Sequence, residues 1–229
     1  MANMPKPVRL FHITAIDNLI EIFEQGALLC KSRSHAAGIG YQNIAHSGAQ
    51  GVRASKAVID PPGGCIHDYV PFYFAPRSPM LMAINGGKVR DCHYRQEDIV
   101  YFELLVRTVV DAQQAFVFYD RNATKEYSQA YTDPHQLKDV IDWKLLTESP
   151  TLDGFCKFFH DIPESEKYLD RMEKRQAEFL VKDQVPISWF RRIGTINDEK
   201  AEIVRRLLVA HGVNLPVEVV PAWYFLPGQ

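Results

Sequence analysis

An α+β fold is predicted by three features of this 229-residue sequence. Segments with strand composition outnumber helical ones, the helical segments are short, and the two types alternate irregularly. No Gly-x-Gly-x-x-Gly turn follows a strand-like segment, which disfavours a doubly wound sheet with a Rossmann dinucleotide site. No Gly/Ser-rich or Pro-rich linker interrupts residues 1–229, so a single domain is expected.

The N-terminal part begins with two short strands around one helix. Strands are expected at residues 8–13 and 27–30. Between them, residues 18–25 have one apolar face and should form a helix with Asp17 as its N-cap. Residues 31–64 are polar and glycine-rich without a clear period, so we expect an irregular loop. A loop of that length within a compact domain is usually functional or disordered.

Residues 64–81 read G-C-I-H-D-Y-V-P-F-Y-F-A-P-R-S-P-M-L and place aromatic residues beside charged ones. Aromatic and β-branched composition predicts a strand at residues 69–74. A serine N-cap followed by a proline predicts a helix at residues 80–84. A strand that ends in aromatic rings and the Arg77 guanidinium can hold a flat heterocycle and a phosphate. The alternative is a buried strand with ordinary core aromatics.

The remaining elements follow no regular unit. Strands are expected at residues 99–107, 115–118, 176–182, 217–220 and 223–226. Helices are expected at residues 137–143, 164–174 and 197–211. The last of these is amphipathic and should end at Gly212.

The formal net charge of −2 argues against a protein that coats nucleic acid through counterion release alone. It leaves open a short single-stranded ligand, because stacking on aromatic side chains carries much of that affinity. Basic residues gather locally at Lys167, Arg171, Lys174 and Arg175. A solvated helix face is the simpler interpretation of such a group.

Four scattered cysteines without a C-x-x-C motif favour a reducing cytosol over a disulfide framework. The first seven residues lack the apolar core of a signal peptide, and no segment is long enough to span a membrane. A cytoplasmic protein without a membrane partner is therefore expected. Cys65 with His67 and Cys92 with His93 lack the second ligand pair of a tetrahedral site, so no metal is expected.

Four motifs occur in a fixed order along nearly the whole chain. They are F-H-I-T from Phe11, V-R-A-S-K from Val52, H-D-Y-V-P-F-Y-F-A-P-R-S-P-M from His67 and Q-A-E-F-L-V from Gln176. Each motif alone is weak, but together, over residues 10–223, they resemble the DarT family. Members of that family are bacterial toxins that ADP-ribosylate single-stranded DNA using NAD. A macrodomain antitoxin called DarG normally neutralises them.

The resemblance implies the ADP-ribosyltransferase fold, a split, sandwiched β-sheet with short helices. It implies NAD as co-substrate, single-stranded DNA as acceptor and a macrodomain antitoxin of the DarG type as partner. Thymine is the expected acceptor base, with guanine as the alternative. Transfer breaks the nicotinamide–ribose bond through a transition state that resembles an oxocarbenium ion. No metal is required, because NAD supplies its own leaving group.

Glu178 and Arg53 are the catalytic candidates. Glu178 lies within a strand pattern, where its carboxylate would steady the developing cation; a solvent-facing strand glutamate is the alternative. The resemblance implies that Arg53 holds the cofactor phosphates or ribose and helps to remove a proton from the acceptor base. Because arginine stays charged, we expect Arg53 to act electrostatically while Glu178 takes the proton.

The resemblance also implies the cofactor contacts. The family's first NAD-contacting strand and helix start match His12, Ile13, Thr14 and Asn18. Backbone groups there would bind the nicotinamide amide, while His12 would face a ribose. Leu28 would form a wall of the nicotinamide pocket. Tyr73 would stack on the nicotinamide ring, although strand alternation leaves the choice among the four aromatics of residues 69–74 open.

Arg77 and Asn122 are the expected substrate contacts. The family has an Asp-Gly-Asn/His-Ala turn where this chain has D-R-N-A from Asp120, so Arg121 departs from the pattern and alters the turn. The segment from Arg121 to Glu178 would present the acceptor. Its aromatic residues would stack on unpaired bases or pack in the core, and they include Tyr127, Tyr131, Phe158 and Phe159.

Two other functions remain open at this point. The same fold acting on RNA or protein is mildly favoured by the negative net charge. A non-enzymatic module that binds nucleic acid or NAD is disfavoured, because a degenerate binder would be expected to have lost Arg53 or Glu178.

Overall fold

The computed structural model describes residues 4–45 and 47–226. The strands are β1 (Arg9–Ala15), β2 (Ala27–Leu29), β3 (Tyr69–Tyr73), β4 (Ile99–Leu105), β5 (Phe116–Tyr119), β6 (Ala130–Tyr131), β7 (Thr151–Leu152), β8 (Phe155–Cys156), β9 (Glu178–Lys182), β10 (Gln184–Pro186), β11 (Arg192–Thr195) and β12 (Val217–Val219). The α-helices are α1 (Leu19–Glu24), α2 (Lys31–Ala36), α3 (Ser47–Ser55), α4 (Pro79–Asn85), α5 (Val106–Asp111), α6 (Leu137–Val140), α7 (Trp143–Thr147), α8 (Arg171–Lys174) and α9 (Asp198–Ala210).

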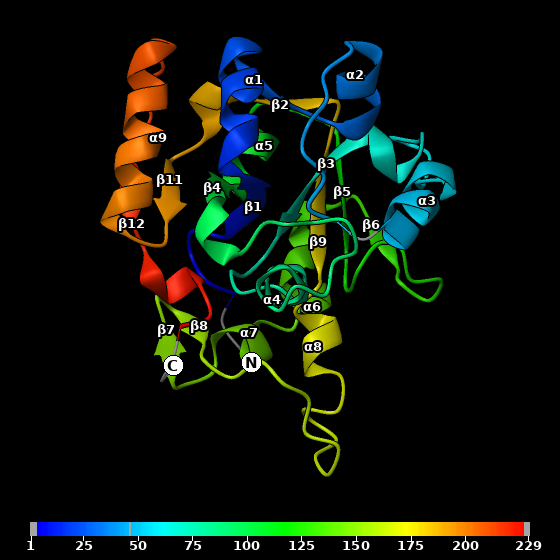
Figure 1. Ribbon diagram of the computed structural model, residues 1–229. Helices are drawn as coiled ribbons and strands as arrows, with labels where there is room; N and C mark the ends of the chain where they lie inside the picture. The colour runs from blue at the N-terminus through cyan, green and yellow to red at the C-terminus, as the bar shows by residue number, and fades with distance from the viewer. Residues whose placement is uncertain (1–3, 46, 227–229) are drawn as a thin grey trace.

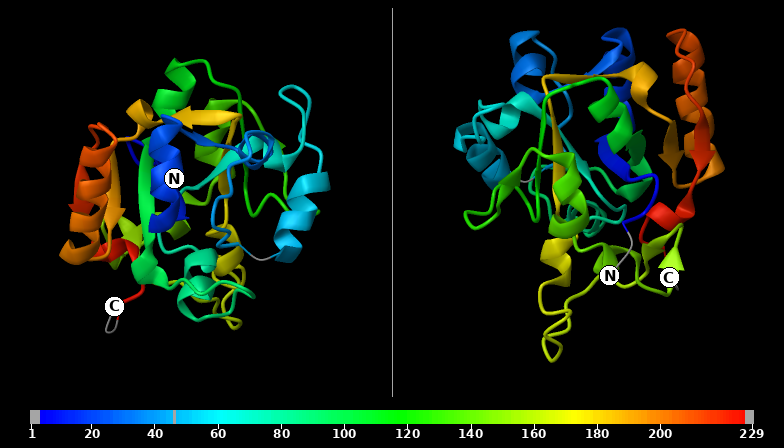
Figure 2. Two further views of the ribbon diagram at one scale, coloured as in Figure 1. Left: turned by 45° about the horizontal axis from the view of Figure 1, so that its top comes forward. Right: turned by 180° about the vertical axis from the view of Figure 1, so that it is seen from behind.

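Eight strands form one sheet in the order β12-β11-β4-β1-β3-β9-β5-β6. Its neighbours pair antiparallel except for β11 and β12. Helices α1 and α9 lie beside each other toward the β12 end, and α2 and α3 lie toward the other end (Figure 1). The two further views show the same separation (Figure 2). Short helices around a mostly antiparallel sheet confirm the α+β prediction.

The sheet is nearly divided between β1 and β3. Strand β1 pairs with β4 along seven residues and β3 pairs with β9 along five. By contrast, β1 and β3 share only the pair Phe11–Tyr73. His12 bridges the gap, with its Nδ1 2.8 Å from the carbonyl oxygen of Pro71. This is the split sheet that was predicted, and it leaves space between the halves.

The helix expected at residues 80–84 is confirmed as α4. The Ser78 hydroxyl caps it by accepting a hydrogen bond from the Leu81 N–H at 3.2 Å, and Pro79 takes its first position. The expected capping by Asp17 is wrong, because a short 3₁₀ turn, Ile16–Asn18, precedes α1. The Asp17 carboxylate instead accepts a hydrogen bond from the Tyr94 hydroxyl.

The structure corrects the sequence prediction in three segments. Residues 31–64 are not wholly irregular, because α2 and α3 form within them. The helix expected at residues 164–174 is limited to α8, since Lys167 and Tyr168 bind Glu148 and turn the preceding chain. That preceding segment projects from the body at the bottom of Figure 1. Residues 223–226 form no strand, because they begin within a 3₁₀ turn, Pro221–Trp223, whose tryptophan is fully buried.

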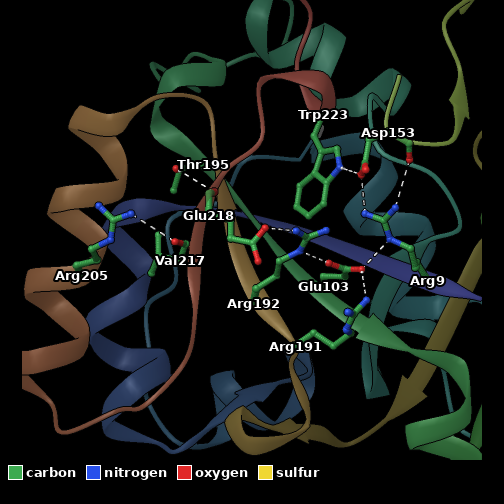
Figure 3. Close-up of polar contacts among 10 residues, drawn as sticks. All are labelled: Arg9, Glu103, Asp153, Arg191, Arg192, Thr195, Arg205, Val217, Glu218 and Trp223. Carbon is green, nitrogen blue, oxygen red and sulfur yellow. Dashed lines mark hydrogen bonds and ion pairs between the residues drawn. The ribbon is translucent and has the colours of Figure 1, made fainter. Parts of the chain in front are cut away.

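A charged cluster joins the strands on the β12 side of the split (Figure 3). The fully buried carboxylate of Glu103, on β4, is paired with Arg9, Arg191 and Arg192. The Trp223 ring packs over Gly194, where a Cβ atom would lie 2.0 Å from the ring, so only glycine fits. The cluster holds β1, β4 and β11 together and therefore fixes one half of the sheet.

Candidate active site

A cavity of about 460 Å³ opens at the split between β1 and β3. We call it the main cavity. Its walls come from β1, β2, β3, β9, α3, α4 and the loop of residues 41–45. The sequence-predicted residues that line it are His12, Ile13, Thr14, Asn18, Leu28, Arg53, Tyr73, Asn122 and Glu178. Motifs linked only by their order in the sequence therefore meet around one space.

Glu178 and Arg53 form an ion pair in this cavity. Glu178 begins β9 and is 2 % exposed. One guanidinium nitrogen of Arg53, Nη1, lies 3.1 Å from Oε1 and 3.0 Å from Oε2 of the carboxylate. The other, Nη2, is buried and has no hydrogen-bond partner in the described chain. A buried donor without a partner is costly, so Arg53 is poised to bind a ligand acceptor.

The protonation of Glu178 is shaped by two opposing effects. Burial raises the pKa of its carboxyl, and the charge and hydrogen bond of Arg53 offset that rise only in part. A carboxylate with a raised pKa accepts a proton more readily than one in water. The site thus combines a negative charge for a developing cation with a potential proton acceptor.

Strand alternation selects the aromatic residues of β3 that reach the cavity. Tyr69 and Tyr73 line it, whereas Phe72 and Phe74 are buried in the core. Tyr73 pairs directly with Glu178 across the sheet, so the two side chains share one face. Burial raises the pKa of Tyr73, so its phenol is neutral. A flat ring held against Tyr73 would lie beside the carboxylate.

His12 offers an uncharged imidazole to the same space. Its Nδ1 lies 2.8 Å from the Pro71 carbonyl, which can only accept, so Nδ1 carries the proton. Burial lowers the pKa of His12 to about 4, although that hydrogen bond opposes the shift. In the neutral ring Nε2 is then an acceptor, suited to a hydroxyl group of a bound sugar.

Asn18 holds the loop of residues 41–45 against β1 in the wall of the main cavity. Its side-chain amide exchanges hydrogen bonds with the main chain of Gln42, at 2.6 Å and 3.1 Å, and donates to the Thr14 hydroxyl at 3.0 Å. Asn18 and Thr14 are both buried, so they shape the cavity as a unit. Ile13 and Leu28 supply apolar wall next to them.

Asn122 lies on the opposite side, near the start of β9. Its Oδ1 accepts from the Thr124 amide and hydroxyl, and its amide nitrogen lies 3.3 Å from Gln176 Oε1. Arg121 does not adopt a positive φ, so the turn accommodates a side chain where the family has glycine. The Arg121 guanidinium pairs with Asp120, Asp170 and Glu173, which ties this turn to α8.

Arg77, one of the two expected substrate contacts, does not line the main cavity. It has a φ of +55° and is 3 % exposed. Its guanidinium donates to the carbonyls of Cys156 at 2.6 Å and Lys157 at 3.0 Å. The turn after β3 therefore directs this side chain away from Tyr73 and into the body of the protein.

Sequence reasoning missed several polar residues that line the cavity. They include Tyr41, Gln50, His67, Lys125 and Gln176. Burial raises the pKa of Tyr41 to about 12, and its hydroxyl has no partner in the described chain. His67 Nε2 lies 2.9 Å from Gln50 Oε1. The available signal was the length and polarity of residues 31–64, from which two of the five, Tyr41 and Gln50, come.

Within the described residues, no group of three His, Cys, Asp or Glu side chains is arranged to hold a metal ion. The cavity instead brings together a buried carboxylate, a partly unpaired guanidinium, a neutral imidazole and three phenols, from Tyr41, Tyr69 and Tyr73. This set suits binding of a large polar nucleotide and electrostatic stabilisation of a sugar cation. Its size lies within the range of small-molecule and cofactor sites.

Comparison with known sequences supports this interpretation of the cavity. The family model described as DarT, ssDNA thymidine ADP-ribosyltransferase, matches residues 11–225. A DNA ADP-ribosyl transferase of Thermus aquaticus is 34% identical over 224 residues, covering 96% of this chain and 90% of that protein. One from Escherichia coli is 31% identical over 221 residues, covering 96% and 95%.

Solved structures are similar over the same extent. The Thermus sp. 2.9 DarT in complex with ADP-ribosylated ssDNA has a TM-score of 0.85 and 31% identity, covering 98% of this chain and all of that one. The same protein in complex with NAD+ has a TM-score of 0.80 and 30% identity, with 97% of this chain covered. The predicted ADP-ribosyltransferase fold is thereby confirmed.

Proposed function

This chain belongs to the DarT family of single-stranded DNA thymidine ADP-ribosyltransferases, and from that premise we propose that it transfers ADP-ribose from NAD to thymine in single-stranded DNA. The observation that carries the proposal is the Arg53–Glu178 pair, which faces the main cavity between Tyr73 and Asn122. NAD is the co-substrate, as in the solved relative with NAD+.

We place nicotinamide against Tyr73, with Leu28 and Ile13 as apolar walls. The adjoining ribose then lies beside Glu178, because Tyr73 and Glu178 are directly paired. His12 accepts a hydrogen bond from a ribose hydroxyl through its free Nε2. The unpartnered Nη2 of Arg53 is available to the diphosphate or a ribose oxygen.

The reaction exchanges one bond at the ribose anomeric carbon. The bond from that carbon to the nicotinamide nitrogen breaks, its electron pair stays on nicotinamide, and the ribose acquires oxocarbenium character. The Glu178 carboxylate stabilises that charge by holding a ribose hydroxyl. A thymine ring nitrogen then bonds to the same carbon and loses its proton, so the products are modified DNA, neutral nicotinamide and a proton.

Glu178 is the proposed acceptor of the thymine proton. Burial raises the pKa of Glu178, which brings its basicity closer to that of a useful general base. Arg53 stays charged and lowers the cost of the base anion through its electrostatic field. In this proposal Glu178 and Arg53 together serve the cleavage of the nicotinamide–ribose bond and the removal of the thymine proton, and neither step uses a metal ion.

The acceptor is single-stranded because the reactive ring nitrogen of thymine is engaged in a base pair within duplex DNA. Asn122, with Thr124 and Gln176, forms the side of the cavity from which we propose that the base enters. The side-chain amides there can read the edge of a flat base. The solved relative with ADP-ribosylated ssDNA supports this acceptor class.

We further propose that the protein is the toxin of a toxin–antitoxin pair. A relative from Thermosipho africanus, 23% identical over 229 residues, is described as a fusion of DNA ADP-ribosyl transferase and DNA ADP-ribosyl glycohydrolase. That fusion supports a macrodomain antitoxin of the DarG type as partner. None of the helices in residues 4–45 and 47–226 has the length and apolar run that a bilayer crossing requires.

The proposal is tested by incubating the protein with NAD labelled in its adenylate moiety and four acceptors: single-stranded DNA, the same strand in a duplex, RNA of the same sequence, and protein. Label is expected on single-stranded DNA alone. Label confined to RNA or protein would refute the DNA acceptor, and hydride transfer to NAD would refute the reaction class.

A further inference from the structure

Three buried arginines lie together outside the main cavity. Arg77, Arg171 and Arg175 are 3 %, 3 % and 2 % exposed. None of them forms an ion pair with a carboxylate within residues 4–45 and 47–226, and the Nε of each lacks a hydrogen-bond partner there. Arg77 and Arg175 both donate to the Cys156 carbonyl. Burial, and to a lesser degree the charge of Arg77, lowers the pKa of Arg175 to about 10.

Such an arrangement is unusual because a buried charge normally has a partner of opposite charge. The cluster around Glu103 shows how this chain otherwise buries arginine, with carboxylates against each guanidinium (Figure 3). For Arg77, Arg171 and Arg175 the only described acceptors are main-chain carbonyls. The positive charge is therefore left for an anion from outside the chain.

A second cavity, of about 440 Å³, is lined by one of these three arginines, Arg77. We call it the aromatic cavity, and it is lined by Arg77, Met82, Lys157, Phe158, Phe159, His160, Tyr224, Phe225 and Leu226. Phe158 is 50 % exposed, although a ring of that size is usually buried. The guanidinium of Arg175 lies over Phe159, and that of Arg171 lies over Phe158 and Tyr168.

One exposed aromatic ring, that of Phe158, beside cations without a carboxylate partner is a combination suited to single-stranded nucleic acid, with a base stacked on the ring and a phosphate near the cations. The site is small and local, so it is compatible with a net charge of −2 for the whole chain. It also lies close to the proposed reaction centre. Met80 and Ala83 of α4 line the main cavity, while Met82 lines the aromatic cavity. One helix, about 10 Å across, separates the two.

We infer that the aromatic cavity is a second nucleotide subsite, which holds a base on Phe158 and its phosphate near Arg77 and Lys157 while the modified thymine occupies the main cavity. This inference rests on the proposed function. It makes Arg77 a contact of the acceptor strand at a position away from the reacting atoms. The backbone of Arg77, with a φ of +55°, is the strained turn that puts it there.

The test measures how tightly the parent and Phe158→Ala bind a series of fluorescent oligonucleotides. Each contains the thymine to be modified, and the series is extended from it one nucleotide at a time. Affinity of the parent should rise in one step when the strand becomes long enough to reach the aromatic cavity. Phe158→Ala should lose that step, about five- to a hundred-fold in Kd, whereas Phe158→Trp should keep it. NAD binding should be equal in all three proteins.

Leu169→Ala is the matched control, since Leu169, like Phe158, lies between β8 and α8 and is 58 % exposed, but does not line the aromatic cavity. It should bind like the parent. Equal affinities of the parent and Phe158→Ala for every length, or an equal loss in Leu169→Ala, would overturn the inference. Failure of the parent to modify any oligonucleotide when it is incubated with NAD would instead refute the proposed function, so the two failures are distinguishable.

Discussion

Two glutamates are buried in strands of the same sheet and paired with arginine, yet their surroundings differ. Glu103, on β4, is fully buried and contacts three guanidiniums, from Arg9, Arg191 and Arg192 (Figure 3). Glu178, on β9, is 2 % exposed and contacts one nitrogen of Arg53. Glu178 lines a cavity of about 460 Å³, and Glu103 does not.

The difference teaches what separates a structural carboxylate from one that we propose to be catalytic. Around Glu103 both oxygens are occupied by several donors, and the arginines are further held by Asp153 and Glu218. Nothing remains for a ligand. Around Glu178 the pairing is sparse, burial raises the pKa of the carboxyl, and a donor of Arg53 stays open. Incomplete pairing beside an empty space is the mark of a binding site.

Replacing the structural carboxylate should have the largest effect on stability. Glu103→Gln leaves three arginines around an uncharged group in a buried place, so the free energy of unfolding should fall by roughly 3–5 kcal/mol. Denaturant unfolding measures the change. Glu218→Gln removes a carboxylate that is 51% exposed from the same cluster, and should cost less than about 1 kcal/mol. Equal stability of Glu103→Gln and the parent would contradict the structural role.

Replacing Glu178, the proposed catalytic carboxylate, should separate activity from stability. Glu178→Gln should slow ADP-ribose transfer by about two to three orders of magnitude, because it removes a charge that stabilises the transition state. Its thermal stability at neutral pH should not fall. Burial raises the folded-state pKa of Glu178, so the ionised form weakens the fold above that pKa, and glutamine mimics the protonated form. A parental transfer rate would make Glu178 an ordinary strand residue.

A third predicted effect concerns acid stability. Burial lowers the pKa of His12 from 6.5 to about 4, so between these values the unfolded chain binds a proton that the folded one does not. His12 thus contributes stability that is present above pH 6.5 and is lost as pH falls toward 4. As pH falls through that window, the free energy of unfolding of His12→Gln should decrease less steeply than that of the parent, by up to about 1.4 kcal/mol per pH unit. Parallel pH profiles would contradict this.

Much of the site was predictable because strand and motif patterns are local. The alternation of β3 places Tyr73 in the main cavity and Phe72 in the core, and the motif order identified Arg53 and Glu178. The sequence did not predict that the Arg77 side chain points away from the main cavity. Its positive φ is unusual for a side chain of its size, and only packing against the Cys156 carbonyl explains it.

Other features depend on long-range contacts that no local pattern encodes. Helix α3 has many small residues and glycines, so its sequence resembles a loop. The strand expected at residues 223–226 does not form, because Trp223 lies in a 3₁₀ turn and its ring fills the space over Gly194. The clusters of buried arginines likewise become visible only when β8, α8 and the end of β3 meet.

Mass spectrometry of one synthetic oligonucleotide with a single thymine tests the central claim most directly. Incubated with NAD and the parent protein, the free strand should gain one ADP-ribose on the thymine base. The same strand annealed to its complement should remain unmodified, as should the free strand with Glu178→Gln. Modification of the duplex at the rate of the free strand, or an ADP-ribose on any other base or on the backbone, would contradict the account.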